Sequence, residues 1–364
     1  MISRLFCAIL PLEFIRKMTY NIFHLILFKS YNSISMIRFV SVFSLNLNGP
    51  REERRKMNYR EFVYAVEKQL NQKMGGDAKV SVYSAVKNNS TERMGVLIEK
   101  PGINISPTIY LEEYFECYID GKTLDQIAEE IKRFYESIRR EESWDYDRIL
   151  QYEGVKDQIV FKLINTKENK EFLETVPNIP FLDLSIVFYV LLEAGSGGSA
   201  AMVVNNTHMS RWDTDVETLW KDAKLNVRRL LPAEFVTMNS ALKGLVHVCV
   251  GGNKRSKDNL LTETEPAEGK DFMYVLSNHI RNYGAACIAY PFIPDMIAHV
   301  LGEDYYILPS SIHELIIIPC SKGIGQDDMN SMIREINDTQ VADEEVLSDH
   351  FYLYRKESGK ITMG

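Results

Sequence analysis

Hydrophobic positions take on a helical spacing directly after Met57. Apolar side chains recur every three or four positions, at Tyr59, Phe62, Val63, Val66 and Leu70. Asn58 precedes them and can cap the helix, so a helix over 58–73 is predicted. Two strand-like runs at 79–86 and 94–100 follow, separated by a turn-rich segment. Further helices are predicted over 108–121 and 123–141, the second beginning with a capping box of Thr123 and Gln126.

From about Gln151 onward, strand-like runs outnumber helical ones. The predicted strands cover 158–165, 181–192, 199–206, 272–278, 285–290, 305–309, 313–319 and 350–356. The predicted helices cover 216–230, 233–242, 292–302 and 327–337. The Gly-Ser-rich segment 195–199 is expected to turn one strand into the next as a hairpin. This order predicts an α+β fold with a mixed, largely antiparallel sheet and helices mainly on one side.

The pattern divides the chain into three parts: residues 1–56, a small N-terminal α+β domain over 57–150 and a main α+β domain over 151–364. Residues 1–56 contain nine Lys or Arg against three Asp or Glu. Their apolar runs are interrupted by Glu13 and His24 and are shorter than the roughly 18–20 residues of a membrane span. Residues 51–56 can all be encoded by purine-only codons, as in a ribosome-binding sequence. We therefore expect Met57 to be the true start, with a basic targeting tail as the alternative.

Composition narrows the class of partner. The net charge is -8, and residues 57–364 alone have 33 basic and 47 acidic side chains. Such a balance argues against nucleic acid and against an anionic membrane surface. The five cysteines include no CxxC pair, so they are expected to be reduced thiols in a cytoplasmic protein. No cofactor motif is present, and the cofactor stays unknown.

The most distinctive polar cluster lies at 307–315, where Ser310, Ser311, His313 and Glu314 interrupt an apolar run. Alternation along a single strand would put Ser311 and His313 on one face and Glu314 on the other. Such a Ser–His pair could act as nucleophile and base if a third group orients the ring. The alternative is a network that satisfies backbone groups at a strand entrance. A zinc-protease motif is excluded, because HExxH would need histidine at Ile317.

Two other positions are candidates. Asp183 lies inside an apolar run, where a carboxylate must be paired, protonated or at the end of the strand. His208 follows Asn205 in a polar segment typical of a turn or helix cap. If His208 and His313 converge near Asp183, a metal or proton-transfer site would result. Spacing alone does not establish that convergence.

Several segments together resemble one bacterial family that is catalogued as a domain of unknown function and is frequent in anaerobic gut bacteria. They are PTIYLEEYFECYIDG, VPNIPFLDLSIVFYVLL, NNTHMSRWDTDVETLWKDAKLN, MYVLSN, YYILPSSIHELIIIP and INDTQVADEEVLSDHFYLY. The resemblance covers residues 57 to about 354 and none of 1–56. Part of it also resembles, more weakly, a second uncharacterised bacterial family. Neither resemblance implies an activity, a ligand or a catalytic residue.

The sequence therefore leaves the function unknown, with three hypotheses. The first is a non-enzymatic binding or regulatory protein whose Ser311/His313 end receives a small molecule or a protein partner. The second is a hydrolase-like enzyme with Ser311 as nucleophile, His313 as base and Asp183 or Glu314 as the orienting group. The third is an interaction module that uses the helix 123–141.

Overall fold

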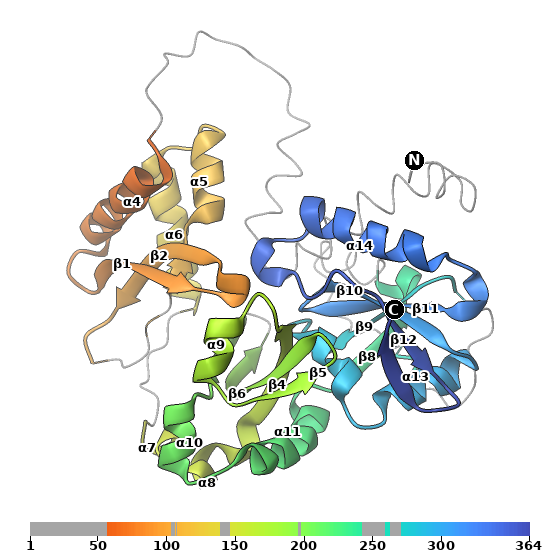
Figure 1. Cartoon of the computed structure of the whole chain (residues 1–364). Coiled ribbons are helices and arrows are strands. Elements are labelled where there is room, and N and C mark those ends of the chain that lie inside the picture. Colours follow the sequence, from red (N-terminus) through yellow and green to blue (C-terminus); the bar gives the residue numbers. More distant parts are fainter. Residues whose placement is uncertain are drawn as a thin grey trace, which may run out of the picture. The chain divides into compact units, whose positions relative to one another are not determined.

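The fold is described from a computed structural model, which describes residues 57–102, 106, 108–138, 146–195, 198–241, 259–262 and 271–364. The predictions made for residues 1–56 lie outside these ranges. The described chain divides between Leu150 and Gln151 into two compact units (Figure 1). Both units combine helices with antiparallel sheets, which confirms the predicted α+β class. None of the described helices is long and apolar enough to cross a membrane.

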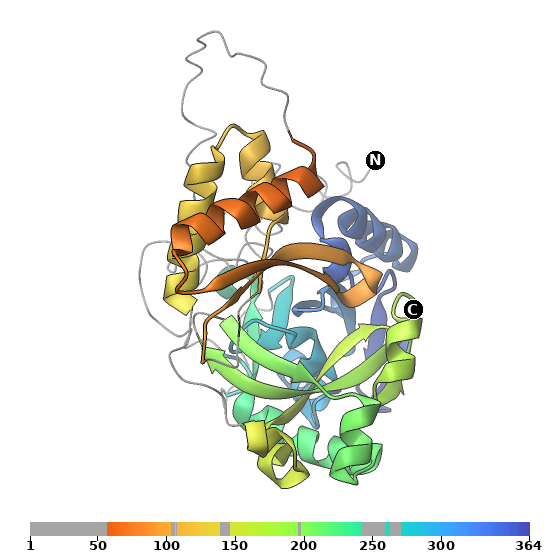
Figure 2. The same ribbon diagram turned by 90° about the vertical axis from the view of Figure 1, so that its left-hand side faces the viewer.

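The N-terminal unit is a three-stranded antiparallel sheet with helices against one face. Its main elements are α4 (Tyr59–Met74), β1 (Lys79–Val86), β2 (Glu92–Glu99), β3 (Thr108–Tyr110), α5 (Glu112–Ile119) and α6 (Leu124–Ile138). The short segments η1 (Asn88–Ser90) and α7 (Tyr146–Ile149) complete the unit. Figure 2 shows α4 lying along the β1–β2 ribbon. The cap predicted at Asn58 is formed, as a capping box with Glu61, and so is the capping box predicted for Thr123 and Gln126.

One boundary in this unit differs from the prediction. The segment predicted as a single helix over 108–121 begins with β3, whose residues Thr108 and Ile109 pair with Leu97 and Val96 of β2. Helix α5 begins only at Glu112. The β1–β2 ribbon gains a third strand in this way. The stabilisation from this extra strand pairing outweighs the local preference of the segment for a helix.

The main unit contains two sheets. The smaller has β6 (Leu184–Gly195) at its centre, paired with β4 (Ile159–Asn165), β5 (Asn178–Phe181) and β7 (Gly198–Val203). The pairing of β6 with β7 confirms the predicted hairpin. Its helical segments are α8 (Tyr152–Val155), η2 (Lys156–Gln158), α9 (Lys170–Thr175), α10 (Asn206–Trp212) and α11 (Val216–Leu230). Trp220 of α11 packs edge-on against Phe161 of β4, so the buried stripe of α11 covers one face of this sheet.

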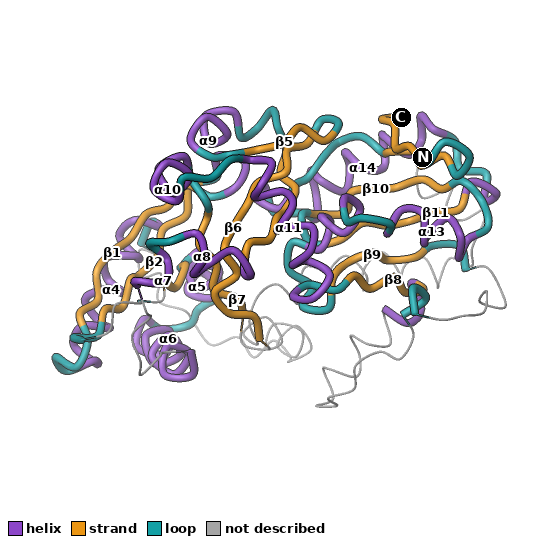
Figure 3. The backbone as a smooth tube through the Cα atoms, turned by 90° about the horizontal axis from the view of Figure 1, so that it is seen from below, coloured by secondary structure: helices purple, strands orange, loops and turns teal. Residues whose placement is uncertain are grey.

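The larger sheet has six strands in the order β13-β12-β10-β11-β9-β8. Figure 3 shows the four neighbouring strands β10, β11, β9 and β8. In chain order these are β8 (Ala233–Thr237), β9 (Tyr274–Asn278), β10 (Tyr305–Ser311), β11 (Glu314–Pro319), β12 (Tyr352–Arg355) and β13 (Lys360–Met363). The connecting helical segments are η3 (Gly284–Ala289), α13 (Ile293–Leu301), η4 (Cys320–Lys322), α14 (Gln326–Gln340) and η5 (Asp343–Glu345). Met329 and Ile333 of α14 are buried against one face of the sheet.

Two assignments in the main unit were wrong. The segment 233–242, predicted as a helix after Pro232, begins with strand β8, in which both Phe235 and Val236 are buried. A strand buried on both faces loses the alternation that would identify it. The segment 285–290, predicted as a strand, belongs to the 3-10 helix η3. Its small residues are buried, and it contacts β9 and β11 of one sheet and β4 of the other.

Candidate functional site

The polar residues singled out in the sequence lie around a tight hairpin turn. Ser311 ends β10, Ile312 and His313 form the turn, and Glu314 begins β11. The expectation that Ser311 and His313 lie on one face of a single strand is therefore wrong, because the chain reverses between Ser311 and Glu314, which face each other across the ladder. The register shifts between Pro309 and Ser311, where proline has no N–H to contribute to the ladder.

Backbone contacts fix this turn on both sides. The Ile312 N–H donates to the Glu345 carbonyl (2.9 Å), and the Ser277 hydroxyl donates to the His313 carbonyl (2.8 Å). The Ile312 carbonyl accepts a bond from the Ala285 N–H (3.3 Å). The turn is thus held between the end of β9, the start of η3 and the end of η5.

The Ser311 hydroxyl is used inside the turn. It is buried, and its Oγ accepts a hydrogen bond from the main-chain N–H of His313 (3.0 Å), as in other serine turns. Among the described residues, no hydrogen bond joins this hydroxyl to the imidazole of His313. A nucleophilic role for Ser311 stays a prediction, and the contact that would activate it is not formed here.

The imidazole of His313 has a defined partner at each nitrogen. Nδ1 accepts the main-chain N–H of Tyr283 (3.1 Å), and Nε2 lies 3.4 Å from Oε1 of Glu345. The Tyr283 ring stacks on the imidazole, with ring centroids 5.6 Å apart. The side chain of His313 is 13% exposed, so the ring lies at the edge of the buried region and is not enclosed by hydrocarbon.

The carboxyl group of Glu314 is buried and not fully hydrogen-bonded. The residue is only 5% exposed, and its Oε1 has no hydrogen-bond partner in the described part of the chain. Burial raises the pKa of Glu314 from its ordinary 4.5 to about 7. That value includes smaller contributions from the neighbouring side chains: Arg281 and His313 lower the pKa, and Glu345 raises it. These four side chains are therefore electrostatically coupled. Together with Tyr283 we call them the hairpin cluster.

The segment that carries Arg281 and Tyr283 has an unusual backbone. Both residues have positive φ, 56° and 53°, a conformation that costs energy for residues other than glycine. The Asn278 side chain bridges to Asn282, donating to its carbonyl (2.7 Å) and accepting its N–H (3.3 Å). At Gly284 a Cβ atom would lie 2.5 Å from the His313 carbonyl oxygen, so only glycine fits this approach.

Arg281 has its own counterion. Its Nη2 lies 3.4 Å from Oε2 of Glu234 on β8, and both side chains are partly exposed. The guanidinium therefore pairs with a partly exposed carboxylate and also lowers the pKa of the buried Glu314. The sequence alone did not identify Arg281, Tyr283 or Glu345 as members of the site, since each is separated from the hairpin by at least 28 positions in the chain.

Asp183 belongs to a different cluster. It lies in the turn between β5 and β6, and its carboxylate accepts hydrogen bonds from the hydroxyls of Ser348 and Tyr352, both 2.7 Å. The expected long strand over 181–192 is therefore interrupted by a two-residue turn at Leu182–Asp183. Neither contact involves His313. The observed partners of Asp183 therefore do not include the imidazole that it was predicted to orient.

His208 also has local partners. Its Nδ1 accepts the Asn205 N–H (3.2 Å) in the capping box of α10, and its ring stacks on Trp212. Burial lowers its pKa. The cap role expected for Asn205 is confirmed. The structure does not bring His208 and His313 together: within the described ranges, no three His, Cys, Asp or Glu side chains form a group that could hold a metal ion.

Comparison with known proteins identifies the family to which the chain belongs. The searches of curated proteins and of solved structures each gave no match. A family model described as "Family of unknown function (DUF5688)" matches residues 59–356, which cover most of both described units and every member of the hairpin cluster. The chain therefore belongs to the DUF5688 family of unknown function.

Proposed function

We propose that the 151–364 unit is a binding domain and that the hairpin cluster receives a small ligand, or a group of similar size presented by a protein partner. The observation that carries the proposal is the buried Oε1 of Glu314, to which no group of the described residues donates a hydrogen bond. Buried polar atoms are nearly always paired, and an unpaired one costs about 1–3 kcal/mol. A bound molecule that donates to this oxygen would remove that cost.

The strained segment beside the cluster supports the same proposal. Arg281 and Tyr283 both adopt left-handed conformations, and Tyr283 contributes a main-chain bond and a ring contact to His313. Strained residues persist where the surrounding structure fixes them, and they are frequent at binding and catalytic sites. Two such residues next to an unsatisfied buried carboxylate favour a site over a purely structural turn.

The proposal includes a cellular setting. The acidic balance of the chain argues against nucleic acid as the partner. Cys117, Cys287 and Cys320 are free thiols, which favours a reducing compartment such as the bacterial cytoplasm. The partner we propose is therefore a small molecule or a protein of the cytoplasm.

The hydrolase alternative has less support. It needs the Ser311 hydroxyl to donate to the imidazole, and no such bond is formed among the described residues. Nδ1 of the imidazole accepts the Tyr283 N–H, and Nε2 faces Glu345. Labelling of the wild type and Ser311→Ala with a serine-reactive probe tests this alternative. Labelling that depends on Ser311 would favour the hydrolase, and equal labelling would remove it.

A ligand screen on the full chain tests the binding proposal. Small molecules in three classes, cationic, neutral and anionic, are added while thermal unfolding and the NMR signals of His313 are recorded. We expect at least one class to raise the unfolding temperature and to shift the His313 signals, because a ligand at 100 times its Kd stabilises by about 2.7 kcal/mol. If no class affects either measurement, the proposal is wrong.

A further inference from the structure

We propose that the group recognised by the hairpin cluster is an organic cation, a protonated amine or guanidine, bound by the carboxylates of Glu314 and Glu345. This inference rests on the proposed function and specifies the chemistry of its ligand. It is argued from the balance of charge in the cluster and from its hydrogen-bonding capacity.

The charges of the cluster do not balance without a ligand. The Arg281 guanidinium lies 3.4 Å from Glu234, so its charge already has a counterion. Arg281 also lowers the pKa of Glu314, but its single charge is shared with Glu234. The other group of the cluster that can be positive is the imidazole of His313, beside Glu345, so three carboxyl groups face two positive groups. Even a protonated imidazole carries a single charge. With all three carboxyls ionised, at least one negative charge therefore stays unbalanced in a poorly hydrated place, where a cation is stabilising.

The hydrogen-bonding groups lead to the same ligand. An ionised carboxylate only accepts hydrogen bonds. Oε1 of Glu314 accepts none among the described residues, and the ion-pair contact of Glu345 is to the imidazole at 3.4 Å. An ammonium group brings three donors and a guanidinium five, and charge-assisted bonds from them are roughly twice as strong as neutral ones. An anionic ligand would bring only further hydrogen-bond acceptors, which cannot bond to these oxygens.

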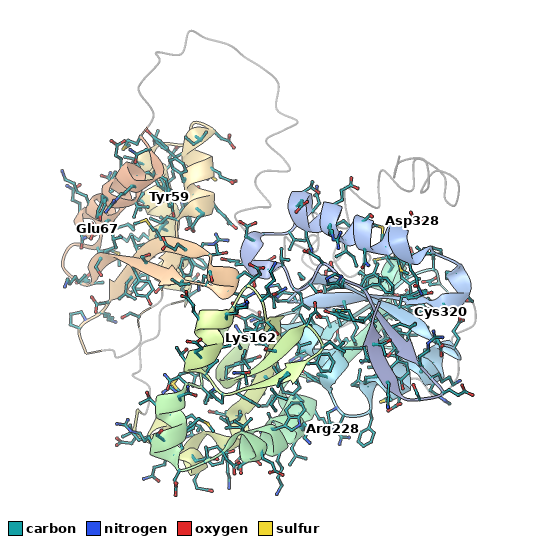
Figure 4. All side chains as sticks on the ribbon, in the orientation of Figure 1. Tyr59, Glu67, Lys162, Arg228, Cys320 and Asp328 are labelled. Carbon is teal, nitrogen blue, oxygen red and sulfur yellow. The ribbon has the colours of Figure 1, made fainter. Side chains whose placement is uncertain are left out.

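The aromatic member of the cluster already contacts a cation. The ammonium of Lys162, a residue of β4 (Figure 4), lies over the Tyr283 ring, 4.5 Å from its centroid. Lys162 thus contacts the aromatic ring and no carboxylate of the cluster. The faces of tyrosine rings attract cations, and Lys162 occupies this one, so an incoming cation pairs with the carboxylates and not with the ring.

Cation binding has a thermodynamic signature that an anion cannot imitate. Because burial raises the pKa of Glu314 to about 7, this carboxyl is partly protonated at neutral pH. A cation that binds its ionised form releases protons, whereas an acceptor ligand that binds the protonated form takes protons up. The sign of the proton exchange therefore identifies the class of ligand independently of affinity.

The test uses n-alkylammonium chlorides from methyl to hexyl, with alcohols and carboxylates of the same chain lengths as neutral and anionic counterparts. Binding to the full chain is measured by calorimetry at pH 7 in two buffers of different ionisation enthalpy, at constant ionic strength. We expect an amine to bind with release of protons. Glu314→Gln should weaken this binding at least about tenfold and abolish the release.

Two further variants keep the result interpretable. Glu303→Gln makes the same change of charge in the same unit, but near the opposite end of β10, and should bind as the wild type does. Glu345→Gln gives a second test of the site if Glu314→Gln does not fold. The inference is overturned if a carboxylate or an alcohol binds and no amine does, or if Glu314→Gln binds the amine as tightly as the wild type. If no probe of any class binds, the proposed function fails with it.

Discussion

The main-chain N–H of Tyr283 donates a hydrogen bond to Nδ1 of His313, over 3.1 Å. Because a nitrogen that accepts a hydrogen bond cannot carry a proton, this contact decides the tautomer of the neutral ring. The proton lies on Nε2, which faces Oε1 of Glu345 at 3.4 Å. A strained backbone segment thereby controls the direction in which the imidazole can donate.

The first prediction concerns this tautomer. In protein labelled with ¹⁵N-histidine, the neutral His313 ring should give a pyridine-like Nδ1 signal and a protonated Nε2 signal at alkaline pH. His313→Gln assigns the signals by their disappearance from the spectrum. A protonated Nδ1 would contradict the hydrogen bond from Tyr283.

The second prediction concerns the dependence of stability on pH. The folded protein holds the Glu314 proton more tightly than the unfolded chain, since burial raises the pKa of Glu314 from 4.5 to about 7. Between these values the folded state binds more protons, so the free energy of unfolding decreases as pH rises. The whole difference corresponds to at most about 3 kcal/mol.

Glu314→Gln removes this titration. Measured by denaturant unfolding from pH 5 to 8, the stability of the variant relative to the wild type should therefore increase with pH and level off above pH 7. A constant difference across this range would show that the Glu314 carboxyl titrates alike in the folded and unfolded states.

The third prediction concerns Gly284. A Cβ atom there would lie 2.1 Å from Oγ of Ser277, 2.5 Å from the His313 carbonyl oxygen and 2.7 Å from the Asn278 nitrogen. Two of these atoms belong to the backbone and cannot move aside. Gly284→Ala should therefore destabilise the protein by about 2–3 kcal/mol and shift the His313 NMR signals.

Gly325→Ala is the matched control for this change. The nearest atom to its added Cβ is Oδ2 of Asp328, at 2.9 Å, in a side chain that can rotate away. A cost below about 1 kcal/mol is expected, because φ at Gly325 is -64°, which alanine adopts without strain, and only the moderate preference of the N-cap for glycine is lost. Equal costs for the two alanine variants would show that the turn adjusts freely around Gly284.

The fourth prediction concerns the cluster around Asp183. Its two oxygens accept hydrogen bonds from Ser348 and Tyr352, linking the β5–β6 turn to the segment that leads into β12. Asp183→Ala should lower the free energy of unfolding by about 2–3 kcal/mol, because it leaves two buried hydroxyls without their acceptor. In a double-mutant cycle with Tyr352→Phe the coupling should be about 1 kcal/mol or more. Strictly additive effects would mean that this bond contributes nothing.

The sequence predicted those elements whose signals are local. Helix α11 covers the predicted range 216–230, because its apolar spacing is contained within one segment. Strands β4 and β11 were likewise identified from short apolar runs. The predicted helix 233–242 shows the limit. It was wrong over 233–237, where β8 is fixed by its pairing with β9, a contact between residues some forty positions apart, whereas residues 238–241 are helical.

The candidate site was predicted in part for the same reason. Ser311, His313 and Glu314 are adjacent in sequence, so their polar character in an apolar run was visible. The turn that separates Ser311 from Glu314 depends on the backbone bond between Ile312 and Glu345, a contact that no local pattern encodes. The unpaired state of Glu314 Oε1 follows from packing of the whole unit and becomes evident only in three dimensions.

The most direct test of this account is the titration of the Glu314 carboxyl itself. The side-chain carboxyl carbon can be followed by ¹³C NMR in labelled protein, with Glu314→Gln assigning the signal, with and without the best-binding alkylammonium ion. The account predicts an apparent pKa of about 7 in the protein alone, decreasing when the cation is added. A pKa near 4.5 that the cation leaves unchanged would contradict it.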